Sequence, residues 1–272
     1  MKKRYWSAVG MTLFLAVTGG LLSIRTGQLS AERTVIAAKY VAVPNYTGRN
    51  FTGIKSQAVD EAYMDNLMSE MLTAYNEIRG TGYDVWTDEQ VKYTTQGMYM
   101  KEADWRAYLQ EKYAEIEKQY AKDDTARMIL SEIVSESELL GYNELDYADM
   151  EASVIGQLIY GNGFASEEEM VKSLELSEEE YQNMVEEYTL QSLKIDYVTE
   201  AIAEAEDLQP SEAELEAAKK EHMEGVLEMG YTEDDDYYKE ELEHWENEED
   251  DYRLFLMAEA VKDFLYENNH IS

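Results

Sequence analysis

The chain contains no cysteine among its 272 residues. This absence excludes disulfide bonds, thiolate catalysis and cysteine-ligated metals, and also a lipoprotein-type anchor, which needs a cysteine to carry the lipid. Histidine occurs only three times, at His222, His244 and His270, and none of these belongs to an H-E-x-x-H zinc motif. Because the histidines lie far apart on polar stretches, we expect surface residues and no metal site.

Basic residues are also scarce, since 23 Lys and Arg face 58 Asp and Glu and leave a net charge of −35. The imbalance is uneven. Residues 1–55 hold eight basic residues against a single acid, Glu32, whereas the remainder holds 15 basic residues against 57 acids. A body this acidic is repelled by nucleic acid and by anionic lipid, so we exclude DNA and RNA binding.

Catalytic motifs are missing as well. The sequence has no G-x-S-x-G nucleophile elbow, no G-x-x-x-x-G-K-[ST] phosphate loop and no G-x-G-x-x-G dinucleotide loop. Carboxylates are so numerous that a pair suited to acid–base catalysis could be chosen almost anywhere, and such a choice carries no information. We therefore expect a protein that is not an enzyme and uses no cofactor.

The first 25 residues carry the clearest targeting signal. Residues 5–24 are uncharged and lie between a basic run at residues 2–4 and Arg25. About 20 such residues cross a ~30 Å hydrocarbon core, and the basic run favours a cytoplasmic N-terminus with the body outside the cytoplasm. A cleaved signal peptide, and hence a secreted protein, is the alternative, although Thr18-Gly19-Gly20 and Ser30-Ala31 are weak cleavage sites.

Residues 26–55 are expected to form an extended connector. They include 40-YVAVPNYTGRNFTGI-54, which has a proline, several turn residues and alternating apolar positions. No other stretch of useful length favours strands, so residues 56–272 are predicted to form an all-α domain.

Helical periodicity and helix starts support this prediction. In a first helix expected over 57–78, apolar residues recur at three- and four-residue steps until the glycines of 79-RGTGYD-84 end the pattern. Capping boxes, two of them with apolar staples, mark later helix starts. They are Thr87 with Gln90 (staple Trp86–Val91), Ser166 with Glu169, Ser177 with Glu180 (staple Leu176–Tyr181) and Ser211 with Glu214.

The most acidic stretch is 232-TEDDDYYKEELEHWENEEDDY-252, with 12 acids in 21 residues. We interpret it as a solvated helix face with a loop, because the D-x-[DN]-x-[DN]-G calcium spacing and its turn glycine are missing; cation binding is the alternative. A last helix is expected over about 252–267, and an asparagine of 268-NNHIS-272 is expected to form its left-handed cap.

Several stretches resemble trigger factor, the bacterial chaperone. Residues 40–72 are similar to the strand-like lead and helix by which that family enters its prolyl-isomerase domain, through Tyr46-Thr47-Gly48 and the helix start Asp60-Glu61. From Trp86 onwards the chain is similar to the family's helical C-terminal domain, notably in 87-TDEQVKYTTQGMYMKEADWRAYLQEKY-113, 129-ILSEIVSESELLGY-142, 176-LSEEEYQNMVEEY-188 and 258-AEAVKDFLYENNHI-271. The resemblance implies the elongated multi-helix body that trigger factor shares with the periplasmic chaperone SurA.

The sequence also departs from that family. The ribosome-docking loop G-F-R-x-G-K-x-P is absent, and only 79-RGTGYDV-85 stands where the family inserts its isomerase domain. Neither ribosome binding nor prolyl isomerisation is therefore carried over to this chain.

These observations lead to a functional hypothesis: a membrane-anchored, extracytoplasmic, ATP-independent chaperone (a holdase) that binds unfolded segments of exported proteins. Flexible Met (14 residues) and amphipathic Tyr (22 residues) suit a surface that accepts varied partners, although they also fill ordinary helix cores. The predicted client-binding groove is lined by Met64, Met68, Met71 and Tyr75 on one helix and by Tyr108 and Tyr113 on the next.

Two other classes remain open at this point. One is a cell-envelope adaptor or structural protein that binds one dedicated partner. The other is a foldase with isomerase activity, for which the sequence offers no isomerase domain.

Overall fold

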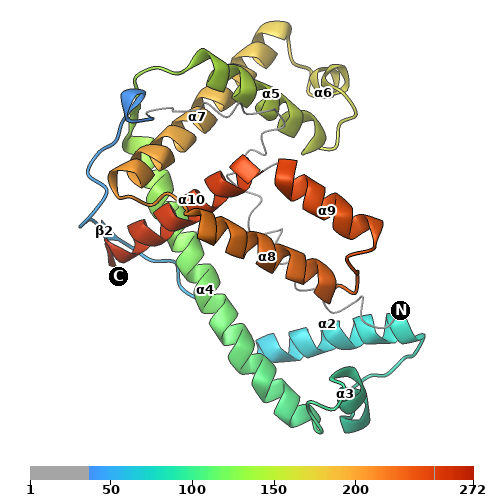
Figure 1. The fold of residues 1–272 in the computed structure, drawn as a ribbon. Helices are drawn as coiled ribbons and strands as arrows, with labels where there is room; N and C mark the ends of the chain where they lie inside the picture. Colours follow the sequence, from blue (N-terminus) through green and yellow to red (C-terminus); the bar gives the residue numbers. More distant parts are fainter. Residues whose placement is uncertain (1–36, 248) are drawn as a thin grey trace. The chain divides into compact units, whose positions relative to one another are not determined.

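The computed structural model describes residues 37–247 and 249–272, so the predicted membrane or signal segment lies outside the described residues. The described chain is mostly helical, with strands of only two residues each, and the prediction of an all-α fold is confirmed (Figure 1). Its contacts divide it into two units. Unit 1 comprises the described residues up to Thr47 together with Leu130–Leu265, and unit 2 comprises Gly48–Ile129 and Tyr266–Ser272.

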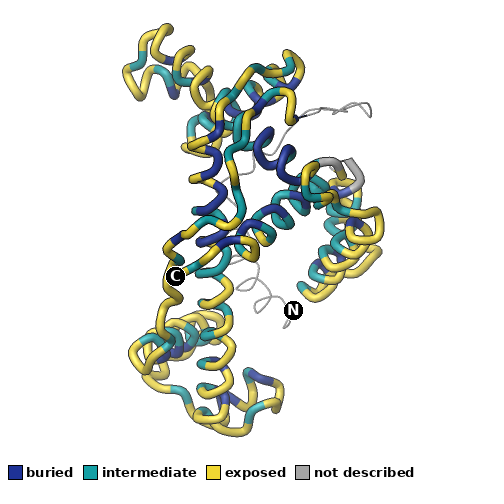
Figure 2. The backbone as a smooth tube through the Cα atoms, turned by 90° about the vertical axis from the view of Figure 1, so that its left-hand side faces the viewer, coloured by how far each residue is buried: buried dark blue, intermediate teal, exposed yellow. Residues whose placement is uncertain are grey.

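Unit 2 is built on three helices and one pair of strands. It contains β2 (Asn50–Phe51), α2 (Glu61–Arg79), α3 (Asp88–Thr94), the first part of α4 (Glu102–Glu136) and β4 (His270–Ile271). Its core is formed by side chains from all three helices, and Figure 2 colours the buried positions of the backbone dark blue. The buried members are Met64, Met68, Val91, Trp105 and Leu109.

Helix α2 begins later than its periodicity predicts. Residues 57–60 are not helical, because Asp60 has extended backbone angles and its side chain accepts a 3.0 Å hydrogen bond from the backbone N–H of Tyr63. Asp60 is therefore the N-cap, and the expected start at residue 57 is wrong. The predicted glycine stop is present, since Gly80 adopts the left-handed conformation (φ 64°) that ends α2.

Unit 1 contains most of the remaining helices. They are η1 (Ala37–Lys39), the end of α4, α5 (Glu144–Tyr160), α6 (Glu167–Ser173), α7 (Glu178–Ala205), α8 (Glu212–Glu228), α9 (Asp236–Asn247) and most of α10 (Glu249–Glu267). Helix α5 packs along α7, which also contacts η1, and α8 packs against α9. One core cluster joins Ile159 of α5 and Met170 of α6 to Tyr181 and Val185 of α7.

The predicted helix caps are present at the starts of four helices, α3, α6, α7 and α8. Thr87–Gln90, Ser177–Glu180 and Ser211–Glu214 form reciprocal capping boxes. The fourth box differs in detail. Ser166 caps α6 as expected, but the carboxylate of Glu169 accepts a 2.8 Å hydrogen bond from Ala165 N, one residue before the cap.

The stretch 40–54 is extended and contributes a strand to each unit. In unit 1, β1 (Val41–Ala42) pairs antiparallel with β3 (Glu138–Leu139), and in unit 2, β2 pairs in parallel with β4. Glycine is required next to β2, because a Cβ on Gly53 would lie 2.7 Å from the Cγ2 of Ile271.

The start of α10, the cap at its end and the surroundings of His222 differ from the sequence-based predictions. Helix α10 begins at Glu249 instead of about residue 252. The expected left-handed asparagine cap is wrong, because neither Asn268 nor Asn269 has a positive φ; instead, the Asn269 side chain accepts a 2.8 Å hydrogen bond from Arg49 N. His222 of α8 is not a free surface residue, because its Nε2 lies 3.1 Å from Oε2 of Glu241 in the acidic stretch.

Candidate protein-binding surface

One end of unit 2 exposes large apolar side chains from several neighbouring segments. They come from the last turn of α2, the α2–α3 connection, α3, the α3–α4 connection and the first turns of α4. We refer to this set as the apolar end, and it consists of Ile78, Tyr83, Val85, Tyr93, Met98, Met100 and Tyr108. Met98 is 79% exposed and Val85 is 69% exposed, so these side chains are available to a partner.

Hydrogen bonds hold the α2–α3 connection in one conformation. The Asn76 side chain accepts from Tyr83 N (3.0 Å) and from the hydroxyl of Thr81 (2.9 Å), and it donates to Tyr83 O (2.8 Å). Trp86 Nε1 donates to Met68 O at 2.8 Å, directly before the capping box of α3. The apolar residues of this connection are thus ordered before a partner binds, which lowers the entropy cost of binding.

In the α3–α4 connection, one apolar residue packs against the core and two are exposed to solvent. Met98 and Met100 are exposed, whereas Tyr99 between them packs against the core of unit 2. The buried hydroxyl of Thr95 accepts a 3.1 Å hydrogen bond from Tyr99 N, and the residues after Thr95 turn through positive φ at Gln96 and Gly97. The two methionines are therefore exposed on either side of a tyrosine that packs against the core.

Aromatic rings connect the apolar end to the core. Trp86 lies 5.3 Å from Tyr75 and 5.0 Å, edge-on, from the buried Trp105. The guanidinium of Arg79 lies 4.5 Å from the ring of Tyr93, so a cation covers one face of this aromatic ring of the apolar end.

The six residues predicted for client binding all lie in unit 2, but they differ in burial. Met64 is fully buried and Met68 is 5% exposed, so both belong to the core and neither lines an open surface. Met71, Tyr75 and Tyr113 are half-buried, and Tyr108 is exposed. Of this set, only Tyr108 belongs to the apolar end.

Sequence reasoning missed Met98, Met100 and Val85, because it searched for apolar stripes at helical spacing. A different signal was present. Met98-Tyr99-Met100 follows Gly97 between two helices, where loops normally carry polar residues. An apolar run in a short connection has no helix core to fill, and this indicates an exposed surface.

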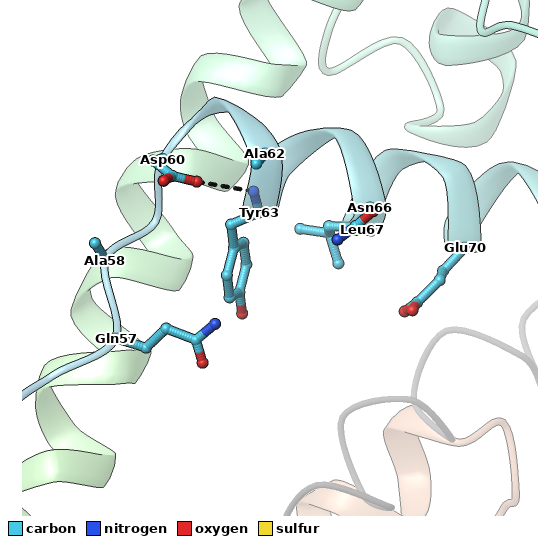
Figure 3. Close-up of a pocket in the computed structure, with 8 residues that line it drawn as sticks. All are labelled: Gln57, Ala58, Asp60, Ala62, Tyr63, Asn66, Leu67 and Glu70. Carbon is cyan, nitrogen blue, oxygen red and sulfur yellow. Dashed lines mark hydrogen bonds between the residues drawn. The ribbon is translucent and has the colours of Figure 1, made fainter.

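A shallow groove of about 470 Å³ runs along the N-terminal half of α2. Figure 3 shows the ring of Tyr63 between Gln57 and Leu67, with Glu70 further along the helix. The lining residues are Gln57, Ala58, Asp60, Ala62, Tyr63, Asn66, Leu67 and Glu70. No lysine or arginine is among them.

Tyr63 is held at this groove by its hydroxyl, which donates a 3.0 Å hydrogen bond to Glu117 of α4. The pKa of Tyr63 is raised from 10.0 to about 12. Burial is the largest cause, and the hydrogen bond to the Glu117 carboxylate is the second. The folded state therefore holds the phenolic proton more tightly than the unfolded state. The resulting stabilisation is complete below pH 10 and is lost as the pH rises through about 12.

Replacing Tyr63 by phenylalanine is expected to reduce the alkaline sensitivity of unit 2. The wild-type chain should lose more stability between pH 9 and pH 12 than Tyr63→Phe, because the variant has no phenolic proton to release at this position. Denaturant unfolding followed by circular dichroism at a series of pH values measures the difference. Equal losses in both proteins would contradict the assigned role of the Tyr63–Glu117 bond.

Compared with known proteins, the chain matches no family model and no curated protein sequence. Over residues 37–247 and 249–272, no helix has the length and apolarity needed to cross a bilayer. Within the same described ranges, no three His, Asp or Glu side chains are grouped as metal ligands, and this includes the described part of the acidic stretch 232–252.

Proposed function

We propose that the protein is a membrane-anchored, extracytoplasmic chaperone of the holdase type, which binds unfolded segments of exported proteins without ATP. The observation that carries this proposal is the apolar end of unit 2. It groups exposed methionine, tyrosine and aliphatic side chains on ordered connections, and its flexible methionines can adapt to clients of varied shape.

The charge distribution suits this role. The uncharged run at residues 5–24, preceded by basic residues, would anchor the chain with its body outside the cytoplasm. Beyond residue 55 the chain holds 57 acids against 15 basic residues, and this excess would keep client-loaded complexes soluble and favour basic clients.

The mechanism is mass action. A protein that binds the unfolded state of a client lowers the free concentration of that state and so slows its aggregation. Affinities of about micromolar Kd are expected, because clients vary in sequence and must be released for folding.

The test is an aggregation assay with the full-length protein in lipid nanodiscs and two unrelated unfolded clients, one acidic and one basic. Wild-type protein should suppress aggregation of both at near-stoichiometric ratios. The double variant Met98→Ser/Met100→Ser should need roughly tenfold more protein for half-maximal protection, because two apolar contacts of about 0.7 kcal/mol each are lost. Both residues are exposed, so helicity should be unchanged.

Leu140→Ser/Leu145→Ser is the matched control, because it makes the same kind of change at exposed positions of unit 1. It should protect clients as wild type does. Equal loss in both double variants would contradict the assignment of the apolar end. Failure of a well-folded wild-type protein to protect either client would exclude a general holdase and favour an adaptor with one dedicated partner.

A further inference from the structure

The groove along α2 is lined by Tyr63 and Glu70, and Tyr113 and Glu117 of α4 contact Tyr63 beside it. The rings of Tyr63 and Tyr113 lie 6.2 Å apart. Glu117 accepts the hydrogen bond from Tyr63, and Glu70 lies in the groove lining on the next turns of α2. Figure 3 shows Glu70 and Tyr63 on the same side of the helix, with Leu67 between them.

Carboxylates on this part of unit 2 fall into two groups. Glu61 and Asp65 share an ion pair with Arg106, whose Nη2 lies 2.8 Å and 2.6 Å from their oxygens. In contrast, neither Glu70 nor Glu117 forms an ion pair with any residue that the structure describes. Negative charge beside tyrosine rings favours a cation, through ion pairing and through attraction to the ring faces.

The groove and the apolar end share one rigid element. Leu67 in the groove and Ile78 in the apolar end are eleven positions apart, which is about three helical turns, so they lie on the same face of α2. From Glu70 to Ile78 the helix rises about 12 Å, a distance that an extended peptide covers in about four residues.

We propose that this groove is a subsite for a lysine or arginine side chain of the client, whose apolar residues about four positions away contact the apolar end. The inference rests on the proposed holdase function and specifies its client class: unfolded segments in which a basic residue flanks an apolar cluster. The groove lining contains no basic residue, and neither Glu70 in the lining nor Glu117 beside it forms an ion pair with a described residue; this supplies the charge complementarity.

The test compares two fluorescent peptides that differ in one functional group. Both carry an apolar cluster, and about four residues before it one has two arginines and the other has two citrullines, which are neutral and nearly isosteric. Binding to the full-length protein in zwitterionic nanodiscs is measured by fluorescence anisotropy. The arginine peptide should bind about threefold to tenfold more tightly at low salt, and the preference should shrink at high salt.

The variant Glu70→Gln/Glu117→Gln removes the two charges while leaving the Asp60 cap and an acceptor for Tyr63 in place. It should lose the preference for arginine but bind the citrulline peptide as wild type does. Glu179→Gln/Glu187→Gln makes the same change in charge at exposed positions of α7 in unit 1, and it should keep the preference.

The outcomes separate this inference from the function on which it rests. If wild type binds both peptides equally, or if Glu70→Gln/Glu117→Gln keeps the preference, the basic-residue subsite is wrong and the holdase proposal stands. If wild type binds neither peptide, the holdase proposal itself fails, and the subsite fails with it.

Discussion

Replacing Met64 by alanine is expected to lower the free energy of unfolding of unit 2 by about 2–5 kcal/mol, the usual effect of truncating a buried methionine. Met64 is fully buried and belongs to the cluster that joins α2 to Trp105 and Leu109 of α4. Its removal leaves a cavity between these helices, which the rigid tryptophan fills poorly. The measurement is amide hydrogen exchange of α2 and α3 at increasing denaturant.

Met98→Ala is the control for this experiment, because Met98 has the same side chain at 79% exposure. It should change the exchange free energies by less than about 0.5 kcal/mol, as surface substitutions usually do. A small effect of Met64→Ala would show that the site is not part of a packed core. The sequence-based hypothesis that Met64 lines an open groove would then regain support.

The second large effect is expected from Tyr197→Phe in unit 1. Tyr197 is fully buried, and its hydroxyl donates a 2.8 Å hydrogen bond to the buried carboxylate of Asp146. The same oxygen accepts from the backbone N–H of Asn143, the N-cap of α5, at 3.2 Å. Burial raises the pKa of Tyr197, so its hydroxyl keeps its proton at neutral pH and remains a donor.

Loss of this hydroxyl should therefore lower the stability of unit 1 by about 1.5–3 kcal/mol, the range for a hydrogen bond to a charged group. The phenyl ring retains its stacking on Tyr40, whose centroid lies 5.3 Å away, so packing is preserved. Hydrogen exchange at α5 and α7 reports the change. Tyr188→Phe, at an exposed position of α7, should have no measurable effect. Equal stability of Tyr197→Phe and wild type would show that the buried hydrogen bond adds nothing net.

Local sequence signals predicted the starts of α3, α6, α7 and α8, because neighbouring residues form a helix cap. A serine or threonine followed three residues later by Glu or Gln satisfies the free N–H groups of a helix start without help from the rest of the fold. Ser177 with Glu180 and Ser211 with Glu214 form such boxes in the structure. Apolar spacing alone predicts a start near residue 57, whereas the cap residue Asp60 marks the true start of α2.

The features that the sequence did not reveal depend on residues far apart in the chain. The two-residue strands β3 and β4 have no pattern of their own, and they exist because Val41 and Phe51 pair with them across long separations. Periodicity identified the apolar stripe of α2 but could not distinguish the buried Met64 from the half-buried Met71 on its flank. Which side of the stripe is covered depends on how α3 and α4 pack against it.

The pairing of β2 with β4 has a consequence for the order of folding. Asn50 and Phe51 pair with His270 and Ile271, so this contact joins residues near the two ends of the described chain. During synthesis or export from the N-terminus, α2, α3 and the first part of α4 emerge early and can form their core. The strand partner of β2 emerges only after α5 to α10, because β4 follows these helices in the chain. Unit 2 is therefore completed only after Leu130–Leu265 of unit 1 have been synthesised, and contacts of such long sequence separation form slowly.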